Sequence, residues 1–214
     1  MIILELFSGT QSLADTARVL GHELVTLDIL AKHSPTICVD ILDWNPEDLR
    51  RNNFHFIHAS VPCESYSRCR STSGERPLQA ADAIVQKTLE VLAYFHRAKW
   101  TIGNPAGSLL WQRTVMCDLA GAIAKTSYCA DGFPYQKRTW FANNLGLLLR
   151  PECDKKTCEQ VVSGRHKEHA QKGGGGTSNR YHTVDELHRI PPRLCKDILL
   201  QLQHPTTQSD AFDF

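Results

Sequence analysis

The chain has 214 residues, which suits one compact domain or one domain with a small appendage. Hydrophobic residues make up 42% of it and charged residues 22%, an ordinary globular composition that excludes a disordered or collagen-like chain. The net charge is only +1, so any contact with nucleic acid must come from a local basic patch. No apolar run is long enough to cross a bilayer, and we expect no membrane partner.

The first residues predict a strand and not a secretion signal. Residues 2–7 are mostly apolar, and no basic segment precedes them, so we expect an intracellular protein of the cytoplasm or nucleus. A reducing compartment leaves the eight cysteines as structural thiols, metal ligands or a nucleophile, rather than as a set of disulfides.

Strand and helix patterns alternate along the chain. Strands are expected at residues 2–7, 24–29, 36–41, 54–60, 100–102, 122–128 and 138–143. Helices are expected at residues 11–20, 78–97, 109–120 and 191–203. This alternation predicts an α/β, Rossmann-like fold, with a mostly parallel sheet and helices on both faces. Ligands bind such sheets at the carboxyl ends of the strands.

The composition changes after residue 150. Residues 151–180 are polar and include four consecutive glycines at 173–176, which do not hold a regular element cheaply. We therefore expect a core at 1–150, an insertion at 151–180, a returning segment with its helix at 181–204, and a tail at 205–214.

Short polar motifs follow several predicted strands. Phe7-Ser8-Gly9-Thr10 is a glycine turn that opens a helix, where a nucleotide-like ligand can approach the backbone closely. Asp28 and Asp40 end the next two strands, where an acid can accept hydrogen bonds from a ribose diol or an adenine amino group. Each also fits a plain turn or capping role, but their order and placement together indicate a nucleotide-binding edge.

The sharpest signal is the segment at 60–67, Ser-Val-Pro-Cys-Glu-Ser-Tyr-Ser, which presents the Cys63 thiol at the mouth of a strand. Two further motifs follow it. Gly103-Asn104-Pro105 comes after the fifth predicted strand, and Gln136-Lys137-Arg138 comes before a late one.

Taken in this order, the motifs resemble the DNA cytosine-5 methyltransferase family over roughly residues 1–145. Residues 4–9 look like that family's first motif, which binds S-adenosylmethionine, and Pro62-Cys63 with Ser67 looks like its nucleophile motif. Asn104-Pro105 is similar to part of the Glu-Asn-Val/Pro motif, and residues 136–138 to the Gln-x-Arg motif. The resemblance implies a Rossmann-like methyltransferase fold and a cofactor site made of Phe7, Ser8, Gly9, Thr10, Asp28, Ile29, Asp40, Ile41 and Pro62.

The resemblance also implies covalent catalysis, in which the Cys63 thiolate adds to cytosine C6, C5 attacks the methyl group of S-adenosylmethionine, and a base removes the C5 proton. Asn104 would fix the loop and position the base, and Arg138 would hold cytosine O2. A depressed pKa of Cys63 is expected, with nearby cations as its cause. These cations are Arg68, Arg70 and Arg138, and the expected DNA contacts are Ser67, Arg68, Arg70 and Gln136.

The sequence departs from the family at three places. Gly103 stands where a glutamate usually assists ring N3, and losing such a general acid costs ~10²–10⁴-fold in rate. Gln11 stands where a second glycine is usual and could crowd the methionine end of the cofactor. The region after residue 150 is too short for the usual target-recognition domain, so specificity is expected to be short or absent, or to come from a partner chain.

Three readings therefore stay open. The first is a minimal DNA cytosine-5 methyltransferase that uses S-adenosylmethionine. The second is a weak or inactive relative that serves as a nucleic-acid-binding or partner subunit, because of Gly103 and Gln11. The third is a methyltransferase that acts on RNA, which we rank below DNA.

Four residues of the insertion have the chemistry of a structural zinc site: Cys153, Cys158, His166 and His169. Free thiols and loop histidines are the alternative. The remaining cysteines, apart from Cys63, lie in apolar patterns and are expected in the core; they are Cys38, Cys117, Cys129 and Cys195.

Overall fold

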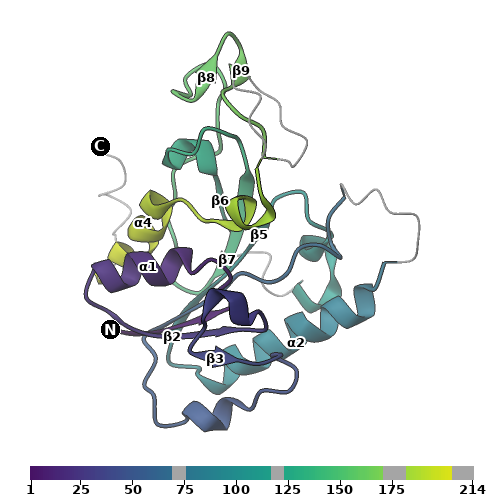
Figure 1. Cartoon of the computed structure of the whole chain (residues 1–214), viewed down its shortest axis with the longest axis vertical. Helices are drawn as coiled ribbons and strands as arrows, with labels where there is room; N and C mark the ends of the chain where they lie inside the picture. Colours follow the sequence, from purple (N-terminus) through teal and green to yellow (C-terminus); the bar gives the residue numbers. More distant parts are fainter. Residues whose placement is uncertain (69–75, 117–122, 171–181, 204–214) are drawn as a thin grey trace.

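The computed structural model describes residues 1–68, 76–116, 123–170 and 182–203. Its centre is a seven-stranded sheet with the order β3-β2-β1-β4-β5-β7-β6 (Figure 1). The strands are β1 (Ile2–Leu6), β2 (Glu23–Asp28), β3 (Ile37–Cys38), β4 (Phe56–Ala59), β5 (Lys99–Pro105), β6 (Ile123–Ser127) and β7 (Arg138–Asn143). The α-helices are α1 (Ser12–Val19), α2 (Leu78–Tyr94), α3 (Val184–His188) and α4 (Pro192–Gln203).

The predicted mostly parallel sheet is confirmed. Strands β3, β2, β1, β4 and β5 run parallel, whereas β7 pairs antiparallel with both β5 and β6. The chain moves outward from β1 to β2 and β3, and then returns to start β4 on the other side of β1. This reversal opens a crevice beyond the carboxyl ends of β1 and β4, where α/β sheets of this kind bind ligands.

Helices cover both faces of the sheet (Figure 1). The alternation of side chains along β1 explains the two layers, because Leu4 and Leu6 pack in the cluster that contains α2, while Ile3 packs with α1 and α4. Helices α1 and α4 lie side by side, although they are far apart in the sequence. The final helix therefore returns to the core beside the first one.

The α-helix expected at residues 109–120 is wrong where the structure describes that range. A short 3₁₀ helix, η3 (Leu109–Gln112), stands there, and the backbone becomes extended at Arg113, with ψ 140°. The Arg113 guanidinium bonds to the Asp82 carboxylate in α2, which draws the chain away from a helical path. Residues 117–122, which complete that range and include Cys117, lie outside the described residues.

Two other expectations change in detail. Strand β5 extends through Pro105, so the Gly103-Asn104-Pro105 motif lies inside a strand that pairs with β7, and not after it. Cys38 is exposed and not in the core, because β3 is a two-residue strand at the edge of the sheet. Cys129 and Cys195 are buried as expected.

The sequence patterns also left one α-helix and two strands unassigned. Helix α3 begins with a capping box between Thr183 and Glu186, a signal that the sequence does carry. Strands β8 (Val161–Val162) and β9 (Arg165–His166) form a small hairpin at the far end of the molecule (Figure 1). Among the described helices, none combines the length and apolar character needed to span a membrane.

Candidate active site

A cavity of about 490 Å³ opens at the carboxyl ends of β1, β2, β4 and β5. The residues expected to bind the cofactor all line it: Phe7, Ser8, Gly9, Thr10, Asp28, Ile29, Asp40, Ile41 and Pro62. Cys63 and Asn104, two of the expected catalytic residues, line the same cavity. The strand-end motifs therefore meet in one space, at the reversal of the strand order.

The turn after β1 has an unusual backbone. Phe7, Gly9 and Gln11 have φ values of 56°, 43° and 55°, in the left-handed region that favours glycine. The Asp28 carboxylate accepts hydrogen bonds from the Gly9 amide at 2.7 Å and from the Leu30 amide at 2.8 Å. Asp28 thereby ties the glycine turn to the end of β2 and shapes one wall of the cavity.

Gln11 does not crowd the cavity, contrary to expectation. Its Nε2 donates to the carbonyl oxygens of His33 and Ser34, and its Oε1 accepts from the Arg18 guanidinium. Gln11 is absent from the cavity lining. Its cost lies in the backbone, because a side chain in the left-handed conformation is disfavoured by roughly 1 kcal/mol where glycine is not.

A hydrogen bond from Asn104 fixes the loop that carries Cys63. The Asn104 Nδ2 donates to the Val61 carbonyl at 2.8 Å, two residues before the cysteine. Tyr66, fully buried after the cysteine, donates its hydroxyl to Asp82 at 2.8 Å. The Cys63 thiol is held half-buried at the rim of the cavity between these two anchors.

Burial raises the pKa of the Cys63 thiol, which corrects the expected depression. The negative charge of Glu64 raises it further, while the Lys137 ammonium lowers it. Burial in turn lowers the pKa of Lys137 to about 8. The cation that faces Cys63 is therefore Lys137, which also lines the cavity and donates to the Leu187 carbonyl at 2.6 Å.

Arg138 lies outside the cavity lining, although it was expected to be catalytic. Successive side chains of a strand point to opposite faces, so Thr139 and Phe141 face the cavity while Arg138 faces away. Its guanidinium makes two bonds to Glu152, at 2.9 and 2.7 Å. Sequence reasoning chose the arginine of the motif and missed the lysine beside it.

Gly103 is closely packed by an aromatic ring. A Cβ at this position would lie 2.9 Å from Phe141 Cε1 and 3.6 Å from His58 Cε1. The ring of Phe141 thus occupies the space that a longer side chain would need. His58 is buried, its pKa is lowered to about 4 by that burial, and its ring bonds to Thr101 at 2.7 Å and to Ser60 at 3.0 Å.

The residues expected to contact DNA are not gathered at the cavity. Arg68 is exposed, Ser67 and Gln136 are half-buried, and none of the three lines the cavity. Arg70 lies outside the described residues. At the rim itself stand Glu64 and His188, with 3.8 Å between Oε1 of the first and Nε2 of the second.

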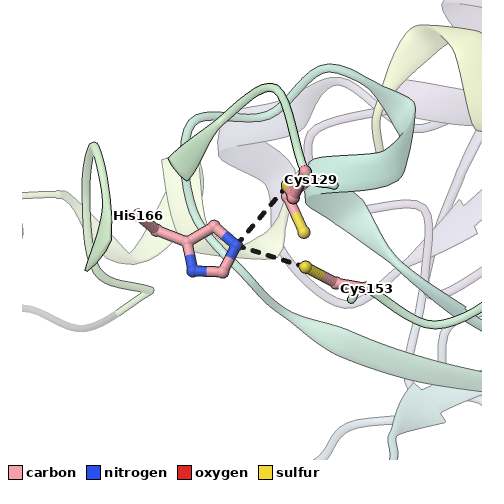
Figure 2. Close-up of side chains that lie close together, drawn as sticks. Cys129, Cys153 and His166 are labelled. Carbon is pink, nitrogen blue, oxygen red and sulfur yellow. Dashed lines mark hydrogen bonds between the residues drawn. The ribbon is translucent and has the colours of Figure 1, made fainter. Parts of the chain in front are cut away.

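A second group of chemically active side chains lies outside the cavity. Of the four residues expected to bind zinc, Cys153, Cys158 and His166 come together, but His169 is not part of the group. Cys129, which the sequence pattern assigns only to the core, completes it. Figure 2 shows the His166 ring directed at the Cys129 and Cys153 thiols.

Comparison with known proteins finds similarity to methyltransferases. No protein-family model matches the chain. A probable DNA (cytosine-5)-methyltransferase of Frog virus 3 is 25% identical over 224 residues, which cover 93% of this chain and 99% of the relative. The sequence therefore resembles that family along nearly its whole length, beyond the motifs themselves.

Solved structures support the fold. The Entamoeba histolytica methyltransferase EhMeth superposes with a TM-score of 0.61 at 9% identity, over 97% of this chain and 99% of that one. A putative DNA modification methyltransferase encoded in an Escherichia coli prophage gives 0.51 at 14% identity, and the S. pombe Dnmt2 methyltransferase gives 0.50 at 14%. The alignments cover 66% and 76% of this chain but only 45% and 57% of those two. The chain has the Rossmann-like fold of these methyltransferases, in a shorter form than the last two.

Proposed function

We propose that this relative of the DNA cytosine-5 methyltransferases transfers a methyl group from S-adenosylmethionine to C5 of cytosine in DNA, through a covalent adduct with Cys63. The observation that carries the proposal is the shared cavity. The cysteine loop after β4 and the glycine turn after β1 line one space at the point where the strand order reverses.

The polar groups of the cavity suit a nucleotide-like cofactor. Ser8 Oγ is buried and has no hydrogen-bond partner among the described residues, so it can serve a polar ligand. The Asp28 carboxylate accepts two backbone hydrogen bonds and has lone pairs left for hydroxyl groups. S-adenosylmethionine, held by these residues, would supply the electrophilic methyl group.

Cys63 acts as the nucleophile in this proposal. Its thiolate forms a bond to cytosine C6, which makes C5 nucleophilic toward the methyl group. After methyl transfer, a base removes the C5 proton, the electrons reform the C5–C6 double bond, and the Cys63 thiolate leaves. Because the base of a duplex is stacked, the target cytosine must first be extruded.

Lys137 supplies the positive charge that this addition needs. The ammonium group favours the Cys63 thiolate and lines the cavity beside it. It is also a donor that can offset negative charge pushed into the cytosine ring. We assign to Lys137 the electrostatic role that the sequence motif suggested for Arg138.

Asn104 orients the reacting groups. Its Nδ2 is engaged by the Val61 carbonyl, but its Oδ1 is buried and has no partner among the described residues. A free acceptor beside the cysteine loop suits the exocyclic amino group of cytosine. Asn104 thus joins the nucleophile loop to the base that the nucleophile attacks.

The test is a covalent trap. Duplex DNA that contains 5-fluorocytosine cannot lose a C5 proton, so the enzyme and S-adenosylmethionine should give an adduct that survives denaturing electrophoresis. Cys63→Ala should abolish the adduct, and Cys38→Ala, at an exposed thiol outside the cavity, should leave it intact. An undiminished adduct with Cys63→Ala would overturn the mechanism. Parallel labelling of DNA and tRNA with methyl-labelled cofactor decides between the two nucleic acids.

Two observations favour a second candidate, a weak or inactive methyltransferase-like subunit. The Phe141 ring fills the space beside Gly103, and burial raises the pKa of Cys63, so both acid assistance and thiolate formation are impaired. This candidate binds S-adenosylmethionine in a calorimetric titration but gives no labelled product. Full turnover by the unmodified protein excludes it.

A further inference from the structure

We propose that Cys129, Cys153, Cys158 and His166 bind one structural Zn²⁺ ion that fastens the insertion to the core. Their ligand atoms all lie within 4.8 Å of one another. The His166 Nε2 is 3.4 Å from the Cys153 sulfur and 3.7 Å from the Cys158 sulfur. A tetrahedral zinc ion separates a thiolate sulfur and an imidazole nitrogen by about 3.6 Å, so the side chains already have the spacing of a ligand set.

Different parts of the chain deliver these ligands. Cys129 comes from the core, in the 3₁₀ helix η5 (Tyr128–Asp131) that follows β6. Cys153 follows β7, and its amide donates to the Ser127 hydroxyl at 3.0 Å, which fixes it beside the end of β6. Cys129 thus belongs to the core, while the other three ligands belong to the insertion that follows β7.

The hairpin returns His166 to Cys158. Ser163 and Gly164 form its two-residue turn with φ values of 51° and 76°, as a type I′ turn requires. In the resulting register His166 pairs with Val161, and the Val161 amide donates to the Cys158 carbonyl at 3.0 Å. The backbone therefore positions both ligands without help from a metal.

The described part of the insertion has no apolar core of its own. Between residues 151 and 170 the buried side chains are polar, namely His166 and Glu168. Glu168 lies 2.9 Å from His182, which joins this segment to the one that returns toward α3. A segment without an apolar core needs a crosslink to stay folded, and three thiolates with one imidazole supply a common structural zinc set.

This site is separate from the proposed active site. None of its four residues lines the cavity that contains Cys63. Four protein ligands leave no open position for substrate or water, so the ion would be structural and not catalytic. Its effect would be to hold residues 151–170 beside β7, where Glu152 bonds to Arg138. The inference therefore does not depend on methyl transfer.

The test measures metal content and ligand identity in the full-length protein. We expect about one Zn²⁺ per chain by elemental analysis, and X-ray absorption should find three sulfur neighbours at about 2.3 Å and one nitrogen at about 2.0 Å. Substitution by Co²⁺ should give the absorption bands of a tetrahedral thiolate site. Cys158→Ser and His166→Ala should each lose most of the bound metal.

Matched controls make the assignment specific. His169→Ala removes a histidine of the same segment, and Cys38→Ser removes an exposed thiol elsewhere, and both should keep the full metal content. If a ligand variant fails to fold, the X-ray absorption data on the unmodified protein still decide the ligand set. Purified protein that takes up no stoichiometric zinc, or that loses it with His169→Ala but keeps it with His166→Ala, would overturn the inference.

Discussion

Cys63 and Lys137 are partly buried side chains that line the same cavity, and the charge of each changes the pKa of the other. Burial raises the pKa of the thiol and lowers the pKa of the ammonium to about 8, while their mutual attraction favours the charged pair. Reactivity of Cys63 should therefore increase as pH rises, because only the thiolate is nucleophilic. At neutral pH most molecules carry the thiol, and the Lys137 charge limits how far its pKa rises.

Replacement of Lys137 by methionine should slow the alkylation of Cys63. Loss of the positive charge raises the thiol pKa further, so we expect a several-fold lower rate with iodoacetamide at neutral pH, and a pH profile displaced upward. Mass spectrometry of the Cys63 peptide over a pH series measures both. The control is Lys125→Met, whose ammonium lies over the Trp140 ring and not in the cavity. An unchanged or faster reaction in Lys137→Met would contradict this account.

Gly103 leaves little room for a side chain beside the Phe141 ring. A Cβ would meet Phe141 Cε1 at 2.9 Å, so Gly103→Ala should lower the free energy of unfolding by roughly 1–3 kcal/mol. Phe141→Leu makes room, so the two changes together should cost less than the sum of their separate costs. Urea unfolding of the four proteins in this cycle gives the coupling. Gly107→Ala, with open space around its Cβ, is the control, and strict additivity would show that the two positions do not compete.

The turn between β1 and α1 combines backbone strain with compensating side-chain bonds. Gln11 has φ 55°, yet its side chain bonds to His33, Ser34 and Arg18. Gln11→Ala removes those bonds and keeps the strain, whereas Gln11→Gly removes both. The glycine variant should therefore be the more stable of the two by about 1 kcal/mol.

Urea unfolding of both Gln11 variants beside the unmodified protein checks this ordering. The comparison is internal, since both variants lose the same hydrogen bonds and differ only in a methyl group. Equal stability, or a more stable alanine variant, would mean that the left-handed backbone at this turn is not strained. Neither variant should alter the cavity wall, because the Gln11 side chain is not part of it.

The elements that the sequence predicted well are those with a strong local signal. Apolar runs that end in Gly9, Asp28 or Cys63 place strand ends at one edge of a parallel sheet, and the cavity lining follows from that topology. Residues 109–120 have helical spacing, but the Arg113–Asp82 ion pair overrides it with a long-range contact. No local pattern reports such a contact.

The direction of side chains and the contacts between distant segments could also not be predicted from the sequence. Near the start of β7, neighbouring side chains point to opposite faces. Lys137 therefore reaches the cavity, at the place expected for Arg138. The apolar surroundings of Cys129 indicated a core residue, and it is indeed buried. Its second property, proximity to Cys153 and His166, exists only after β6 and the insertion have packed together.

The chain is shorter than two of the methyltransferase structures that it resembles in fold. It spans 45% and 57% of those two structures, and among the described residues the strands β8 and β9 and the helix α3 lie between β7 and α4. Figure 1 shows β8 and β9 projecting from the body, away from α2. The net charge of +1 provides no long-range attraction to an anionic partner, so any contact with nucleic acid must come from a local basic patch.

Glu5 connects β1 to the start of α1, and its buried carboxyl should make the stability of the protein depend on pH. It lies on β1, accepts a hydrogen bond from the Ala14 amide at 3.1 Å, and has its pKa raised to about 8 by burial. A carboxyl whose folded pKa is raised stabilises the protein fully below its unfolded pKa, near 4.5, and this contribution is lost as pH rises through about 8. The loss should be on the order of 5 kcal/mol.

Glu5→Gln keeps an acceptor for the amide but cannot ionise, so this part of the pH dependence should vanish. Buried histidines act in the opposite direction, because the pKa of His58 is lowered to about 4 and its contribution is lost as pH falls. The difference between Glu5→Gln and the unmodified protein therefore isolates Glu5. Urea unfolding should show that difference growing in favour of the variant between about pH 5 and about pH 8. Glu23→Gln, at the exposed start of β2, should show no such trend, and a pH-independent difference for Glu5→Gln would mean that the buried carboxyl does not titrate in this range.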